Sequence, residues 1–160
     1  MPARRRAHTR TMELKLKYLS LPILFFSISI SGCAITVSEL KSSHSSYDGS
    51  FTSEKTPSDT YRNLRLMARQ CLEHETYTGK PVIVLSEFSD ERSEGEINQK
   101  LLSEGLLINN ALIEIERHDA NKAQVRLYTT KNILSVGARS PKISDIKRWA
   151  DGDINCANEL

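Results

Sequence analysis

Reactive motifs, aromatic residues and long apolar runs are all scarce in this 160-residue chain. Aromatic residues make up 6% of it, and its seven glycines and five prolines are scattered. The sequence contains no Cys-x-x-Cys, His-Glu-x-x-His, Gly-x-Ser-x-Gly or glycine-rich phosphate loop. These absences argue against thioredoxin-like redox proteins, the common zinc proteases, serine hydrolases of the α/β class and P-loop nucleotide-binding proteins.

Excess positive charge is also absent once the N-terminal segment is set apart. The whole chain carries a formal charge of +2, but six of its 22 basic residues and only one of its 20 acidic residues precede residue 33. The remainder has 16 basic and 19 acidic residues, a net charge of −3. This balance gives no reason to expect a nucleic-acid partner.

The most apolar run covers residues 19–30, about a dozen residues, whereas a membrane-spanning helix needs roughly 20. A basic segment precedes the run and small residues follow it, which is typical of a signal peptide. At the end of the run, the sequence reads Ile30-Ser31-Gly32-Cys33: an aliphatic residue, a small residue, glycine and cysteine. This pattern resembles the lipobox of bacterial lipoproteins.

The resemblance implies export, removal of residues 1–32 as a signal peptide, and a thioether between the sulfur of Cys33 and a diacylglyceryl group. A second acylation at the new N-terminus would convert weak membrane binding into stable anchoring. Ala34, in place of aspartate, favours the outer membrane facing the periplasm in a Gram-negative host. The alternative is an uncleaved membrane anchor, for which Pro22 within the apolar run is a poor choice. Residues 1–11 precede Met12, a more compact start, and we interpret them as a mis-called start.

Residues 33–55 are rich in serine and threonine and lack apolar periodicity. They are predicted to form a flexible tether between the lipidated cysteine and a domain over residues 56–160. A coil of about 20 residues reaches roughly 25 Å.

The domain is predicted to begin with a helix capped by Thr56 and to end with a helix from Ser140 to Gly152. Strands are expected over residues 81–88, 106–117, 123–129 and 133–136, the middle two forming a hairpin. Residues 96–102 fit either a strand or a short helix. This order predicts an α+β fold, a two-layer sandwich in which helices cover an antiparallel sheet of three to five strands and Trp149 lies between the layers.

Cysteine use points to one disulfide. With Cys33 lipidated, Cys71 and Cys156 remain as an even pair in an oxidising compartment, so we predict that they are bonded. The alternative is a redox or metal pair, which the absence of Cys-x-x-Cys and of neighbouring ligand-spaced histidines disfavours.

The remaining candidate side chains have plain interpretations. An acidic cluster could bind a hard cation but lacks the spacing of a calcium loop, so it is interpreted as a solvated loop. His74 and His118 are interpreted as helix-end and turn residues. We therefore expect no cofactor and no metal, and assign no catalytic residue. The acidic cluster comprises Glu87, Asp90, Glu91, Glu94 and Glu96.

Three functions fit these features. The first is a non-catalytic accessory lipoprotein of the cell envelope that docks on an envelope protein or the cell wall. The second is a membrane-tethered hydrolase using Glu87 and its neighbours. The third is a small-molecule or glycan binder that uses the sheet face around Tyr128.

Overall fold

The computed structural model describes residues 36–130 and 137–156. The predicted signal peptide, Cys33 and the short strand expected at residues 133–136 lie outside these ranges. Among the residues described, no helix is both long and apolar enough to cross a membrane.

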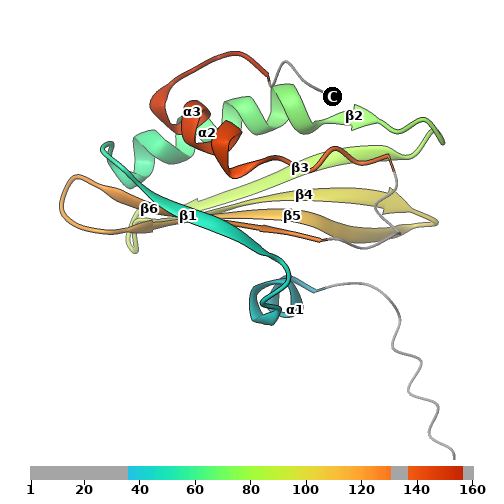
Figure 1. The fold of residues 1–160 in the computed structure, drawn as a ribbon, viewed down its shortest axis with the longest axis horizontal. Coiled ribbons are helices and arrows are strands. Elements are labelled where there is room, and N and C mark those ends of the chain that lie inside the picture. Colours follow the sequence, from blue (N-terminus) through green and yellow to red (C-terminus); the bar gives the residue numbers. More distant parts are fainter. Residues whose placement is uncertain (1–35, 131–136, 157–160) are drawn as a thin grey trace, which may run out of the picture. The chain divides into compact units, whose positions relative to one another are not determined.

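Six antiparallel strands form one curled sheet, a half-barrel in which the first strand lies at one edge (Figure 1). Their order is β1-β6-β5-β4-β3-β2. The predicted hairpin of residues 106–117 and 123–129 is present, with Glu116 opposite Gln124. The strands are β1 (Tyr47–Ser53), β2 (His74–Glu75), β3 (Pro81–Ser89), β4 (Glu94–Ser103), β5 (Leu106–Arg117) and β6 (Ala123–Thr129).

Three helices flank this sheet on opposite sides (Figure 1). The helices α2 (Pro57–Leu72) and α3 (Ile143–Asp151) pack on each other and on one side, here called the helix face. The short helix α1 (Val37–Ser42) packs against β5 and β6 on the other side, here called the outer face.

The main core lies between the sheet and the helices α2 and α3. Strands β3, β4 and β6 alternate buried and more exposed residues, so that every second side chain enters this core. In β5, residues 108–115 are buried on both faces. Leu64 of α2, Ile113 of β5 and Trp149 of α3 are at most 1% exposed and belong to one cluster. The Trp149 indole also donates a hydrogen bond to the carbonyl of Asn155. The helix α3 ends at Gly152, whose φ of 99° is the left-handed conformation of a C-cap.

The predicted two-layer sandwich with three to five strands is wrong. The described residues form mostly sheet, with six strands and three short helices, and a strand precedes the helix α2. Two strands escaped prediction for physical reasons. The edge strand β1 buries only Ser53 completely, so it shows no apolar alternation, and β2 has two residues. The ambiguous residues 96–102 belong to the strand β4.

Residues 36–55 also differ from the predicted flexible tether. Thr36 and Glu39 form a capping box at the start of α1, and Leu40 is fully buried. The strand β1 pairs with β6, so backbone hydrogen bonds to a distant segment hold one side of it in the sheet. The folded domain therefore begins about 20 residues earlier than the sequence pattern indicates.

Candidate functional site

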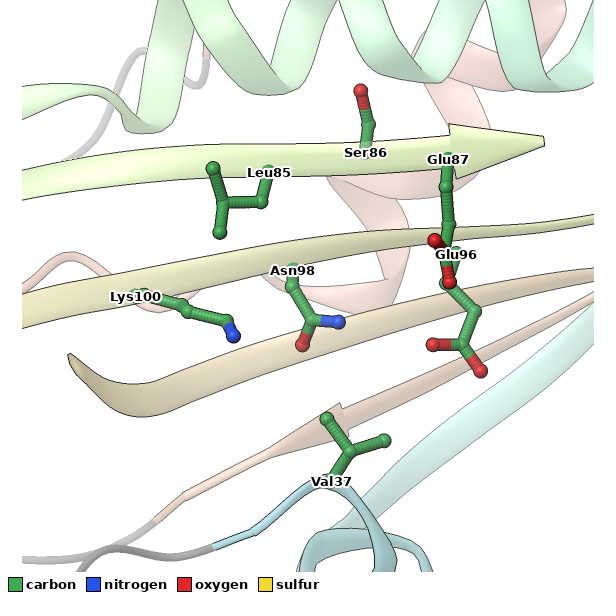
Figure 2. Close-up of a pocket in the computed structure, with 7 residues that line it drawn as sticks. All are labelled: Val37, Leu85, Ser86, Glu87, Glu96, Asn98 and Lys100. Atoms are coloured by element: carbon green, nitrogen blue, oxygen red, sulfur yellow. The ribbon is translucent and has the colours of Figure 1, made fainter.

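A groove of about 350 Å³ opens on the outer face, between the first turn of α1 and the strands β3 and β4. Figure 2 shows Leu85, Asn98 and Lys100 directed toward α1, whereas Ser86 points the opposite way, toward α2. Val37 closes the groove from the side of α1. The full lining is Val37, Leu85, Ser86, Glu87, Glu96, Asn98 and Lys100.

The strand period places these side chains. Residues two apart on a strand share a face, so Leu85 and Glu87 of β3 lie beside Glu96, Asn98 and Lys100 of β4. The register pairs Leu85 with Asn98 and Glu87 with Glu96. The groove is thus apolar and basic toward Lys100 and acidic toward Glu87.

The helix α1 is held on the outer face by one apolar contact region and one ion-pair network. Leu40 and Leu112, which is opposite Asn98 in the register, are both fully buried. Lys41 Nζ lies 2.7 Å from Glu96 Oε1 and 2.5 Å from Glu114 Oε1. Because the three side chains are only partly exposed, these pairs are less screened than free surface charges.

The electrostatics of Lys41 follow from those contacts. Partial burial by itself lowers the pKa of the ammonium, but hydrogen bonds and charge from Glu114 and Glu96 outweigh burial and raise the pKa above its ordinary value. Lys41 therefore stays charged and neutralises Glu96 at the groove's edge.

Glu87 and Glu96 face each other across β3 and β4, which brings two carboxylates of the predicted acidic cluster together. Like charges directly opposite each other destabilise a sheet. The ion pair from Lys41 to Glu96 relieves this repulsion. Asn98 Oδ1, one residue pair further along, is buried and accepts no hydrogen bond from the described part of the chain.

The rest of the acidic cluster lies at the β3–β4 hairpin. Asp90 and Glu91 occupy the turn, and Glu94 Oε2 lies 3.6 Å from Arg92 Nε. A second, smaller hollow of about 220 Å³ lies beside this hairpin. Within residues 36–130 and 137–156, no group of three or more histidine, cysteine, aspartate or glutamate side chains is arranged to hold a metal ion.

The other residues singled out in the sequence lie away from the groove. His74 of β2 has its Nδ1 2.8 Å from the carbonyl of Leu72 and its Nε2 3.1 Å from that of Gly137. His118 lies in the β5–β6 turn and donates its backbone N–H to the carbonyl of Lys122.

Tyr128 is on the outer face, but it is not part of the groove. Its ring packs against Tyr47 with a centroid distance of 5.7 Å. Burial and then the negative charge of Glu114 raise the pKa of its hydroxyl. The groove's described lining contains no aromatic side chain on which a sugar could stack.

The structure joins Cys71, near the end of α2, to Cys156, after α3, in a disulfide with a Cα–Cα distance of 5.4 Å. The bridge closes a segment that contains β2 to β6 and α3. Cys33 lies outside the described residues.

Sequence reasoning named the two glutamates of the groove but missed its remaining residues. The alternation of residues 81–88 and 96–102 could have placed Leu85, Asn98 and Lys100 on one face. Nothing in the local pattern of residues 36–42 indicates that α1 would cover part of that face, since its only fully buried side chain is Leu40.

No family model, no curated protein and no solved structure matches this chain.

Proposed function

We propose that the protein is a lipid-anchored, non-catalytic accessory protein of the bacterial cell envelope. An acylated Cys33 holds it on the membrane, facing the periplasm from the outer membrane in a Gram-negative host. Its folded domain binds an envelope protein or the cell wall through the acidic end of the groove.

The observation that carries this proposal is the pattern Ile30-Ser31-Gly32-Cys33 directly after a short apolar run. The first helix of the described residues, α1, is capped by Thr36, three residues after Cys33. Removal of residues 1–32 would therefore leave the whole described fold intact. The same order is what a lipoprotein requires: leader, acylated cysteine, domain.

The groove supports binding more than it supports chemistry. Its Glu96 is neutralised by Lys41, and Leu85 and Val37 give it an apolar wall. Toward the hairpin, residues 87–96 carry five carboxylates and one arginine. An acidic, solvent-exposed surface of this kind favours association with a basic partner surface and speeds the encounter.

One observation favours the hydrolase as a second candidate. Glu87 and Glu96 are cross-strand neighbours, and paired carboxylates are the usual apparatus for acid–base hydrolysis of glycosides. Under that alternative, the purified full-length protein should hydrolyse a cell-wall glycan, and Glu87→Gln alone should abolish turnover. Under the accessory function, no turnover is expected with either form.

The anchor is tested by metabolic labelling with palmitate. We expect Cys33→Ala to lose the label and to accumulate as a longer precursor, because the acylated sulfur is missing. Cys156→Ser is the matched control, since it removes another cysteine and should keep wild-type labelling. Labelling of Cys33→Ala at the wild-type level would contradict the proposal.

The partner surface is tested by photo-crosslinking in intact cells. A photo-crosslinking amino acid in place of Glu94, in the acidic hairpin, should give a discrete adduct that weakens as salt is raised. The same amino acid in place of Leu66, which is exposed on α2, is the control and should not give that adduct. Identical adducts from both positions would argue against a specific acidic docking surface.

A further inference from the structure

We propose that one end of the sheet rests on the bilayer that holds the lipid of Cys33, so that the domain has a fixed orientation on the membrane. This inference depends on the proposed lipid anchor. The surface concerned, here called the turn end, is formed by the β2–β3 and β4–β5 turns with their apolar side chains Tyr77, Leu102, Leu106 and Leu107.

The turn end exposes large apolar side chains. Tyr77 is 76% exposed, Leu106 60%, Leu107 41% and Leu102 36%. Single exposed apolar residues are ordinary on protein surfaces, but a group of them in one place marks an interaction site.

Two contacts and one chain connection place these residues at the same end. Lys80 of the first turn donates from Nζ to Oγ of Ser103, the last residue of β4, at 2.7 Å. Leu102 and Leu107 are direct partners in the β4–β5 register. Tyr77 lies in the turn that contains Lys80. The apolar residues therefore belong to two adjacent turns.

The predicted lipid anchor is close to this surface. Lys100 and Val37 line one groove, and Leu102 follows Lys100 by two residues on the same face of β4. Thr36 is three residues from Cys33, so their Cα atoms are at most about 11 Å apart in any conformation. A tether this short keeps the outer face, with Leu102 and Leu107, within reach of the headgroups.

The charge distribution selects the same orientation. The β3–β4 hairpin has a net charge of −4 over residues 87–96. It lies at the opposite end of β3 and β4 from the turn end. The turn end is balanced, with Lys80 and Lys100 against Glu75 and Glu104. An anionic bilayer surface repels the acidic β3–β4 hairpin but does not repel the turn end. Tyrosine and leucine beside lysine are also side chains that suit a membrane interface, where an apolar body is buried and a polar tip stays wet.

The occupant we assign to the turn end is therefore phospholipid, rather than a second copy of the chain or a protein. The short connection to Cys33 carries this choice. A membrane is held within about 11 Å of Thr36 at all times, whereas another macromolecule would have to compete with it for the same surface.

The test uses the full-length lipidated protein in vesicles of phosphatidylethanolamine and phosphatidylglycerol with brominated acyl chains, which quench nearby tryptophan. Leu106→Trp and Tyr77→Trp report on the turn end. Leu66→Trp is the matched control, since Leu66 is 64% exposed on α2, on the other side of the sheet. Trp149 is 1% exposed and contributes the same background to every variant.

We expect brominated lipid to reduce the added emission at residues 106 and 77 by about half or more and to leave that at residue 66 unchanged. Equal quenching at all three positions, or quenching at none, would overturn the orientation. The mass of the N-terminal peptide is measured on the same samples. Quenching that fails on an acylated protein contradicts only this inference, whereas an unmodified Cys33 contradicts the proposed anchor.

Discussion

At the scale of single residues, Lys41 is the cation that ties α1 to the outer face of the sheet. It joins α1 to two strands at once, through Glu96 of β4 and Glu114 of β5, and Glu114 is 9% exposed. Arg126 Nη1 lies 3.9 Å from Glu114 Oε2, but it forms a shorter ion pair, of 2.7 Å, with Glu116 Oε2. Removing Lys41 would leave Glu96 and Glu114 close together without their shared cation.

We therefore expect Lys41→Met to lower the free energy of unfolding by about 1–3 kcal/mol, the usual range when a partly buried carboxylate loses its partner. Urea denaturation at neutral pH measures this. Lys147→Met is the control, because Lys147 is exposed on α3, and its effect should stay within about 0.5 kcal/mol. Equal effects of the two substitutions would contradict the role given to Lys41.

The pKa of Lys41 adds a pH dependence to the same comparison. Its pKa is raised in the folded state, so its contribution to stability is fully present below the ordinary lysine pKa of about 10.4 and declines as pH rises toward the folded value. The stability difference between wild type and Lys41→Met should thus be constant from about pH 7 to 9 and narrow above about pH 10.4. Urea titrations of both proteins, one set between about pH 7 and 9 and one above about pH 10.4, measure this difference. A stability difference between the two proteins that increased above about pH 10.4 would contradict a raised pKa of Lys41.

At the scale of elements, the sequence predicted what is locally encoded and missed what depends on distant contacts. The cap at Thr56, the alternation in β5 and β6, and the turn at Gly152 each leave a pattern within a few residues. The strand β1 leaves none. Its side chains are mostly small and polar, and its order comes from pairing with β6, whose partner residues are 70 to 81 positions away. The groove was missed for the same reason, since α1 becomes a wall only after it packs on β5.

The helix α1 gives a direct test of its ordered state. It has six residues, too few to be stable alone, so its helicity depends on packing. Leu40→Ala should cost about 2–4 kcal/mol, as for other fully buried leucines, and should speed hydrogen exchange in residues 37–42. Leu66→Ala, at an exposed site of α2, should change stability by less than about 0.5 kcal/mol. Exchange in residues 37–42 that is fast already in the wild type would support the flexible tether instead.

At the scale of the whole molecule, the two faces of the sheet differ in what covers them. The helix face builds the main core with α2 and α3. The outer face, partly covered by α1, remains free for the groove and the turn end. The two ends of β3 and β4 also differ, one acidic and one apolar. In the lipid-anchored protein that we propose, this arrangement would place the apolar end on the bilayer and present the acidic end to a partner.

The disulfide controls the stability of the whole domain, because Cys71 and Cys156 are 85 residues apart. In the chain-entropy account, a bridge that closes a loop of this size destabilises the unfolded chain by about 4–5 kcal/mol, an upper figure for a real protein. Cys71→Ser and Cys156→Ser remove the same bridge, so each should lower Tm by a similar amount. The double variant should be no worse than either single variant, since the three share one lost interaction. Calorimetry of the wild type and the three variants measures these Tm values. Reducing agent should lower the Tm of the wild type to that of the double variant and leave the Tm of the double variant unchanged. Additive losses in the two single variants would show that the cysteines contribute separately, and would contradict a bond between them.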